Sequence, residues 1–396
     1  MVSFLPFGIS ITAILAIFLN IYLKKTRLNF DKKARFNSLP KHYSYCFCLW
    51  VVVFLLMLVF CDFSQNTKYI LFSLLVFASL VLIIFLYSKN FNAKKHFEKS
   101  NVFILFITAL IGIGITVLIT LIIFFESIKF FELVNVFDFF TGLSWNPQTA
   151  IAIEQGVSNS SFGVVPVFLG TILITLIAML VAIPVGIICA IYLGMYAKPK
   201  QRDFLKPILE ILAGVPTVVY GYFAVIAIAP FFRNFLTFFG LEVSTESALA
   251  TGFVMGVMII PFILSLTDDA INSVPQSLKD ASLALGSTKS EMIKKVVIPS
   301  AIPSIIGAII LATSRAIGET MIVVMSAGLI AKLTINPLDS MTTATAQIVT
   351  LLVGDQEFDS PKTLSAFALA LTLFIFTFVL NVIALSVIKK FRKKYS

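Results

Sequence analysis

The chain has 396 residues, of which 59% are hydrophobic and 13% are charged, and its formal net charge at pH 7 is +10. The charged share is about half that of a typical soluble domain, and the mean hydropathy of +0.99 exceeds what one buried core requires. These values exclude a soluble protein and predict an all-α membrane protein, because helices satisfy their own backbone hydrogen bonds in lipid.

Nine apolar runs are long enough to cross a bilayer, which takes about 20 residues in a helix. They cover residues 5–23, 44–62, 69–88, 102–125, 165–193, 207–232, 247–266, 302–330 and 363–388. The first run has no small-residue cleavage site after it, so we expect a retained span rather than a signal peptide. The first three runs carry no motif, and we expect residues 1–100 to form a three-span extension before a second domain, residues 101–396.

Lysine and arginine concentrate in alternate loops, which predicts the direction of the spans. They cluster in residues 24–41, 89–99, 198–206, 268–299 and 389–394. Because basic loops stay in the cytoplasm, we expect a periplasmic N-terminus and a cytoplasmic C-terminus in a bacterial inner membrane. The positive charge is then a topology signal and a contact with anionic membrane lipid, and no nucleic-acid partner is expected.

The loop at residues 126–164 contains an aromatic stretch that ends in a turn. Trp145 follows Phe139 and Phe140, and Asn146-Pro147 marks the turn. Large aromatic side chains of this kind gather at the membrane surface. We expect an interfacial anchor here, with a lid or a docking surface as the alternatives.

Spans five and six contain proline and glycine residues at interior positions. Pro184 and Pro216 should kink their helices and free backbone carbonyls, which is tolerated only against protein or a water-filled path. Three glycines permit close approach of neighbouring helices: Gly186, Gly214 and Gly221. Pro184, Gly214, Pro216 and Tyr220 are therefore candidate kink or pore-lining positions, although packing alone also explains them.

A polar segment, residues 268–299 and hereafter the elbow, separates spans seven and eight. Pro275 suits the first position of a helix, and Gly286 offers a left-handed stop to it. Thr288 and Glu291 have the spacing of a capping box, which predicts a second helix that ends at Pro299. We expect a helix–glycine–helix elbow that a partner grips, or else an amphipathic elbow lying on lipid headgroups.

Span eight carries two charged residues, Arg315 and Glu319, at positions i and i+4. Arg315 lies roughly 20 Å along a helix from the start of the span at 1.5 Å per residue, too deep for its side chain to reach the membrane surface. Such an arginine costs about 2.5–3.5 kcal/mol to insert. Either the pair is a structural salt bridge, or Arg315 faces an aqueous path and neutralises a passing anion, with Glu319 accepting a hydrogen bond from a protonated one.

The elbow resembles the coupling loop of ATP-binding-cassette (ABC) importer permeases. That signature reads Glu-Ala-Ala, three residues, Gly, nine residues and Ile-x-Leu-Pro; here it reads Asp280-Ala281-Ser282, Gly286 and Val296-Val297-Ile298-Pro299. The four departures are conservative. The resemblance implies that residues 267–301 form a coupling loop that docks into a cytoplasmic ATPase, through Asp280, Ala281, Ser282, Gly286 and Pro299.

A closer resemblance covers residues from about 130 to the end, around two-thirds of the chain. These residues are similar to the PstC-type permease family of phosphate-specific ABC importers, as shown by Ser144-Trp145-Asn146-Pro147, Leu212 to Gly221 and Arg315-Ala316-Ile317-Gly318-Glu319-Thr320. The resemblance implies a type I permease core of about six transmembrane helices, here preceded by three extra ones. It also implies a substrate path at Arg315, Glu319 and Thr320.

The same resemblance implies partners. They are a homologous second permease subunit, two cytoplasmic ATP-binding subunits, a periplasmic phosphate-binding protein and phosphate itself. A permease for sulfate, molybdate or phosphonate, or a membrane scaffold that signals phosphate status, are the alternatives.

No enzyme is expected, because the sequence contains neither a Walker A motif nor a Ser-His-Asp set. The four cysteines lack metal or disulfide-framework spacing, so no cofactor or metal is expected. ATP hydrolysis would then belong to the partner ATPase.

Overall fold

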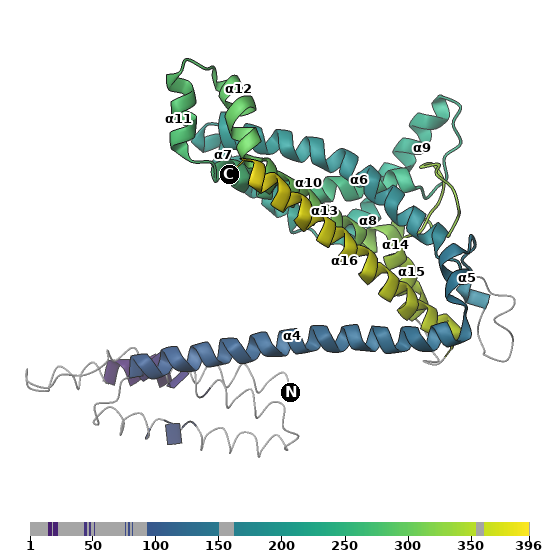
Figure 1. Ribbon diagram of the computed structural model, residues 1–396, viewed down its shortest axis with the longest axis horizontal. Coiled ribbons are helices and arrows are strands. Elements are labelled where there is room, and N and C mark those ends of the chain that lie inside the picture. The colour runs from purple at the N-terminus through teal and green to yellow at the C-terminus, as the bar shows by residue number, and fades with distance from the viewer. Residues whose placement is uncertain are drawn as a thin grey trace, which may run out of the picture. The chain divides into compact units, whose positions relative to one another are not determined.

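The structure is a computed structural model that describes residues 15–17, 19–22, 43–45, 47–48, 51, 76, 78–79, 81, 93–149, 162–353 and 360–395 (Figure 1). The chain divides into two compact units, Met1–Leu118 and Ile119–Ser396. The three spans expected within residues 1–100 fall almost wholly outside the described residues.

The described residues are almost entirely helical, which confirms the expected all-α class. The helices are α4 (Ala93–Leu133), α5 (Val136–Thr141), α6 (Val165–Ile191), α7 (Pro199–Ala213), α8 (Thr217–Phe223), α9 (Ala229–Phe238), α10 (Ala248–Asn272), α11 (Gln276–Ala284), α12 (Lys289–Met292), α13 (Ile298–Ile317), α14 (Met321–Ser326), α15 (Ala344–Leu352) and α16 (Pro361–Tyr395). Six helical segments of the described chain are long and apolar enough to cross a membrane. They correspond to the six core spans that the sequence predicts.

Close packing of α6 against α10 forms the centre of the larger unit, and glycines allow it. A Cβ atom added to Gly252 would lie 2.7 Å from the Cβ of Ile177, and one added to Gly256 would lie 2.7 Å from the carbonyl oxygen of Ala178. Gly186 on α6 similarly approaches Ile263 on α10. Two glycines four residues apart are a recurrent device for tight helix contact in membranes, and the role expected for Gly186 is confirmed.

Span six is broken, contrary to the expected single helix over residues 207–232. Helix α7 ends at Ala213 with Gly214 as its C-cap, and Pro216 is the N-cap of α8. The break arises because proline donates no backbone N–H and disfavours helical geometry in the residue before it. Pro216 therefore separates two helices instead of kinking one, and the apolar segment that can cross the membrane is Thr217–Phe238.

Tyr220 and Gly221 hold α8 in place beyond this break. The hydroxyl of Tyr220 donates to the carbonyl oxygen of Leu212 at 2.8 Å, which ties α8 to the last turn of α7. A Cβ atom added to Gly221 would lie 3.2 Å from the Cα of Ile322 on α14. The close approach expected at Gly221 is confirmed, whereas Gly214 ends a helix and packs against no other one in the described chain.

Span eight differs from the expected helix at both ends. The helix continues through Pro299, because a π-helical turn at Ile293–Val297 widens the backbone just before it. Gly318 then caps α13 after Ile317, and a separate helix, α14, begins at Met321. The expectations that Pro299 ends the second elbow helix and that one helix covers residues 302–330 are both wrong.

Trp145 is buried, although an interfacial position was expected. Its side chain is 5% exposed and packs edge-on against Phe139 and Phe162. The indole N–H donates to the side-chain oxygen of Gln347 on α15 at 3.0 Å. The aromatic stretch thus packs inside the protein, where it connects α15 to the segment that follows α5.

Candidate functional site

Arg315 lies in the last turn of α13 with an exposed side chain. Its guanidinium carbon is 5.7 Å from the ring centroid of Phe262 on α10, the distance of a cation–π contact. Within residues 93–149, 162–353 and 360–395, Arg315 forms no ion pair with a carboxylate. Its positive charge is therefore available to an anion that reaches this face of α13.

Glu319 does not pair with Arg315, so the expected i,i+4 pair on one helix is wrong. The helix ends between the two residues because Gly318 caps it. One carboxylate oxygen of Glu319 accepts a hydrogen bond from the backbone N–H of Ile322 at 3.4 Å, at the start of α14. Its backbone carbonyl accepts one from the hydroxyl of Thr345 at 2.9 Å, which joins this junction to α15.

The three expected path residues, Arg315, Glu319 and Thr320, all lie at the junction of α13 and α14. Thr320 is the N-cap residue of α14, and its hydroxyl donates to the carbonyl oxygen of Gly318 at 3.4 Å. Glu319 and Thr320 are both half-buried. The junction therefore offers one exposed cation, one partly accessible carboxylate and one hydroxyl within six residues.

One face of α13 is not covered by the part of the chain that the structure describes. The exposed residues on this face follow helical spacing: Ser300, Ser304, Leu311 and Arg315. The opposite face is buried in the described chain, through Ala301, Ile305, Ala308, Ala312 and Ala316. The uncovered face carries hydroxyls toward the elbow, an apolar side chain at Leu311 and a cation toward α14.

The elbow has the geometry that its sequence predicts. Gly286 adopts a φ of +84°, a left-handed conformation that separates α11 from α12. Thr288 and Glu291 form the expected capping box, in which the Glu291 carboxylate accepts from the Thr288 backbone N–H at 3.0 Å. Helix α11 begins one residue later than expected, with Pro275 as its N-cap.

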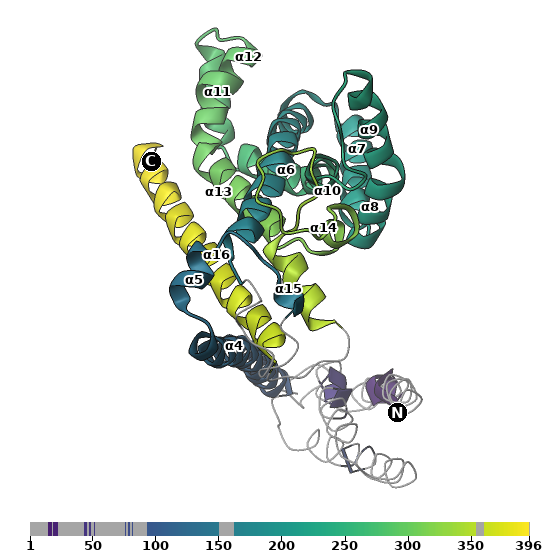
Figure 2. The same cartoon turned by 90° about the vertical axis from the view of Figure 1, so that its right-hand side faces the viewer.

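The elbow projects beyond the neighbouring ends of α10 and α13 (Figure 2). Leu278, Leu283 and Leu285 are all exposed, and Leu285 reaches 90%. The signature residues follow the same pattern: Asp280, Ala281 and Gly286 are exposed, and Ser282 and Pro299 are half-buried. A hydrogen bond of 2.7 Å between the hydroxyls of Ser282 and Ser287 closes the turn. Exposed leucines of this kind suit contact with a partner protein or with lipid.

A buried charge cluster, which the sequence reasoning missed, holds the base of the elbow. Asp268 was expected in the polar segment but lies inside α10 with 1% exposure. Its carboxylate is 2.8 Å from Nη2 of Arg202 and 3.0 Å from Nζ of Lys206, both on α7. The side-chain amide of Asn272 donates to it at 3.0 Å. The signals in the sequence were two cations four residues apart and a pair of acids, Asp268 and Asp269, at the end of an apolar span.

A loop at residues 327–343 covers the other end of α10. The backbone N–H of Ala248 donates to the carbonyl oxygen of Asp339 at 3.1 Å. The ammonium group of Lys332 lies 2.9 Å from the Asp339 carboxylate, and its hydrogen bond lowers the pKa of that carboxyl below the ordinary value. The loop is therefore held by an ion pair within it and by a hydrogen bond to the first turn of α10.

The remaining candidate residues lie at the break in span six or on α6. Pro184 is exposed on α6, which runs unbroken through it. Gly214 and Pro216 are exposed at the break. Tyr220 is buried in the same apolar cluster as Ala316, the neighbour of Arg315. Tyr220 thus connects the break with the α13 core, and Pro184 lies on the outer surface of its helix.

Comparison with known proteins places these features in a family. Residues 182–393 match the family model described as "Binding-protein-dependent transport system inner membrane component". The matched segment contains the elbow, Arg315 and the break in span six, and it exceeds half of the 396 residues. The chain belongs to this permease family. It is a multi-pass membrane permease of the ABC importer class, which agrees with the resemblance of the elbow to a coupling loop.

Several relatives match across most of their own length. The chain is 34% identical over 273 residues to "Probable ABC transporter permease protein YqgH" of Bacillus subtilis (strain 168), covering 68% of this chain and 84% of that protein. It is 33% identical over 266 residues to "Phosphate transport system permease protein PstC" of Mesorhizobium japonicum, covering 63% and 77%. The expected resemblance to PstC-type permeases is confirmed.

Solved structures of importers also resemble the chain at low identity. One is the structure titled "Crystal structure of bacterial alginate ABC transporter in complex with alginate pentasaccharide-bound periplasmic protein", with 14% identity, a TM-score of 0.49 and coverage of 74% of this chain and 94% of the other. Another is an inward-facing MetNI methionine ABC transporter, with 18% identity, a TM-score of 0.43 and coverage of 58% and 94%.

Proposed function

We propose that the chain is the permease subunit that forms half of the path of an ATP-driven, high-affinity importer of inorganic phosphate. The observation that supports it most is the state of Arg315. A guanidinium group in a spanning helix costs about 2.5–3.5 kcal/mol to insert, and Arg315 has no carboxylate partner in the described chain. A guanidinium binds an oxyanion through two parallel hydrogen bonds. A passing oxyanion would therefore pair with the charge of Arg315 and account for its presence in the span.

The junction chemistry favours phosphate over sulfate. A carboxylate only accepts hydrogen bonds, so Glu319 binds an anion that still carries a proton. Hydrogen phosphate carries such a proton at neutral pH, whereas sulfate does not. Glu319 and Thr320 follow Arg315 at the end of α13, so a protonated oxyanion meets both a donor and an acceptor there.

The uncovered face of α13 needs a second protein wall to enclose a path. A homologous permease subunit supplies that wall, and the two chains form a heterodimer. Arg315, Ser304 and Ser300 then face a shared aqueous path between the subunits. Each chain alone is half of the path.

Coupling to ATP takes place through the elbow. Two cytoplasmic ATPase subunits each grip one elbow, through Asp280, Ala281 and the exposed leucines. Closure of the ATPase dimer tilts the elbows and switches the path between its two openings. The ion cluster at Asp268 transmits that tilt, because it joins α7 and α10 at the base of the elbow.

The orientation follows from the basic loops. The elbow and the C-terminus lie in the cytoplasm, and the N-terminus lies in the periplasm of a bacterial inner membrane. A periplasmic phosphate-binding protein delivers the anion to the end of the permease opposite the elbow. Residues 1–100 form a three-span extension of the permease domain, residues 101–396.

Accumulation of radioactive phosphate tests the proposal. The chain is reconstituted with its second permease, ATPase subunits and binding protein in vesicles, and ATP is supplied on the elbow side. Uptake that needs ATP and that excess sulfate, molybdate or phosphonate does not displace supports a phosphate importer. Displacement by one of those anions identifies a permease for a related oxyanion. Absence of phosphate accumulation by an assembled complex would contradict the transport role and leave the signalling scaffold as the alternative.

A further inference from the structure

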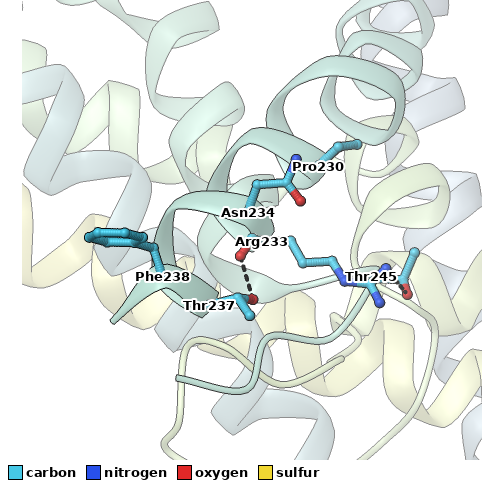
Figure 3. A pocket seen from close by; sticks show the side chains of 6 residues that line it. All are labelled: Pro230, Arg233, Asn234, Thr237, Phe238 and Thr245. Atoms are coloured by element: carbon cyan, nitrogen blue, oxygen red, sulfur yellow. Dashed lines mark hydrogen bonds between the residues drawn. The ribbon is translucent and has the colours of Figure 1, made fainter. Parts of the chain in front are cut away.

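A pocket with mixed polar and apolar walls lies along α9 (Figure 3), at the opposite end of α10 from the elbow. Its volume is about 520 Å³, and it is lined by Pro230, Arg233, Asn234, Thr237, Phe238 and Thr245. Four of these residues bring polar side chains, and none is a carboxylate. The pocket has room for a small hydrated ligand.

The wall that carries Thr245 is fixed on both sides. The backbone N–H of Ser244 donates to the carbonyl oxygen of Leu338 at 3.0 Å. The hydroxyl of Ser340 donates to the carbonyl oxygen of Glu246 at 2.7 Å. Thr245 is therefore held between two contacts with the loop at residues 327–343. One wall of the pocket is α9, and the other is the segment that carries Thr245.

Arg233 is the only charged residue that lines the pocket, and it is available to a ligand. Nη1 of Arg233 points to the hydroxyl oxygen of Thr245 at 3.5 Å (Figure 3). It forms no ion pair within the part of the chain that the structure describes. A guanidinium group has five N–H donors, so most of the donors of Arg233 remain for a bound anion.

The hydroxyls divide into a donor and an acceptor. Thr237 donates its proton to the carbonyl oxygen of Arg233 at 2.7 Å, which leaves its oxygen to accept. Thr245 accepts from Arg233, which leaves its proton to donate. The side chain of Asn234 can do both. An anion that also carries a proton, as hydrogen phosphate does, satisfies this set better than one that does not.

The opposite side of α9 is apolar. The rings of Phe231 and Phe235 stack with centroids 6.2 Å apart, and both side chains are exposed. Residues advance by about 100° each on a helix, so Arg233 points roughly 160° away from Phe231. Figure 3 shows that the ring of Phe238, which lines the apolar edge of the pocket, is directed away from Arg233. Because exposed phenylalanines suit lipid, the face with Arg233 is the one that meets water.

We propose that this pocket is a receiving site, in which Arg233, Thr245 and Thr237 bind a protonated tetrahedral oxyanion before it enters the path at Arg315. The inference rests on the proposed function for the identity of the anion. It assigns an entry role to residues that lie outside the coupling loop and the α13–α14 junction. In the proposed orientation the pocket faces the periplasm.

Direct binding of radioactive phosphate to the assembled transporter tests this inference without turnover. The complex is purified in discs of neutral phosphatidylcholine, without binding protein or ATP, and binding is measured by equilibrium dialysis. Arg233→Gln should weaken binding by at least about tenfold, since a hydrogen bond to a charged group contributes about 1.5–3 kcal/mol. Arg233→Lys, which keeps the charge but loses the fork of donors, should weaken it by less.

Lys332→Gln is the matched control. It removes one positive charge from the same end of the protein, where Lys332 pairs with Asp339 outside the pocket. Equal effects of Arg233→Gln and Lys332→Gln would show a general electrostatic field and overturn the site. Thr245→Val, which retains the shape of the side chain, should weaken binding as well, and unchanged binding in an Arg233→Gln complex that assembles normally would also overturn it.

A lipid headgroup is the other source of the same phosphate chemistry. Native mass spectrometry of the complex from its own membrane distinguishes the two. A phospholipid that stays with the wild type and is lost in Arg233→Gln, together with no exchange of radioactive phosphate, would overturn the receiving site. If phosphate binds at Arg233 but no ATP-dependent uptake occurs, the proposed function fails and the pocket stands. If uptake occurs and Arg233→Gln leaves both binding and uptake unchanged, only the pocket fails.

Discussion

The carboxylate of Glu319 is hydrogen-bonded to the start of α14, and not to Arg315, which precedes it by four residues. The separation matters because a neutralised pair would have little attraction for an anion. The end of α13 at Ile317 keeps the two charges apart. In the proposed path, Arg315 would bind an anion and Glu319 would select a protonated one.

Glu319→Gln should relax the selection between phosphate and sulfate. The amide keeps an oxygen that can cap α14, but it also presents N–H donors to an anion. We expect sulfate to compete with phosphate uptake at a concentration at least about tenfold lower than in the wild type, by analogy with the cost of one mismatched buried hydrogen bond. Competition curves with both anions measure this, and identical curves for variant and wild type would contradict the role of Glu319.

Gly256→Ala should destabilise the permease, because the added methyl group would lie 2.7 Å from the carbonyl oxygen of Ala178. Overpacking of this kind costs about 1–3 kcal/mol. Gly112→Ala is the control, since its added methyl group would meet nothing within 4 Å. Thermal unfolding in detergent should show a lower midpoint for the first variant only, and equal midpoints would contradict the tight contact of α6 and α10.

Asp268→Asn should destabilise the base of the elbow by leaving Arg202 and Lys206 without their carboxylate. Breaking a fully buried pair costs about 3–5 kcal/mol. Arg202 and Lys206 are 32% and 29% exposed, so we expect a smaller loss of about 1–2 kcal/mol after solvent screening. Adding Arg202→Gln and Lys206→Gln to the same chain should recover part of the loss, and a further decrease would contradict the cluster.

Leu285→Ser should weaken binding of the ATPase without affecting the fold, because the side chain is 90% exposed. Lys294→Gln provides the comparison. Lys294 is also exposed, but it lies in the π-helical turn Ile293–Val297 that follows α12. Copurification of the ATPase with each variant measures the effect. Loss with Leu285→Ser and retention with Lys294→Gln would support the elbow as the docking surface, and retention with both would contradict it.

The elbow could be predicted from sequence because its determinants are local. A capping box at Thr288 and a left-handed glycine at Gly286 act over a few residues, and both are confirmed. Hydropathy does not reveal the break in span six, because it is the same in an apolar helix and an apolar turn. The break in span eight coincides with Gly318, Glu319 and Thr320, a polar stretch that is equally compatible with a charged face of one helix. Gly214 and Pro216 mark the first break, but glycine and proline also occur inside kinked membrane helices, so their presence alone does not predict a break.

The charge cluster and the burial of Trp145 could not be predicted, because both depend on contacts between segments distant in sequence. Asp268 meets Arg202 across 66 residues, and Trp145 meets Gln347 across 202. Patterns within one segment do not reveal which partner a polar group finds. The roles of Arg315, Glu319 and Thr320 in the path stay predictions.

Uptake of radioactive phosphate by vesicles that contain Arg315→Gln tests the central claim most directly. The reconstituted complex with its partner subunits is compared with the wild type and with Arg315→Lys, and assembly is checked by size-exclusion chromatography. We predict that Arg315→Gln assembles normally and loses ATP-dependent phosphate accumulation, while Arg315→Lys retains a fraction of it. Normal accumulation by an assembled Arg315→Gln complex would contradict the account.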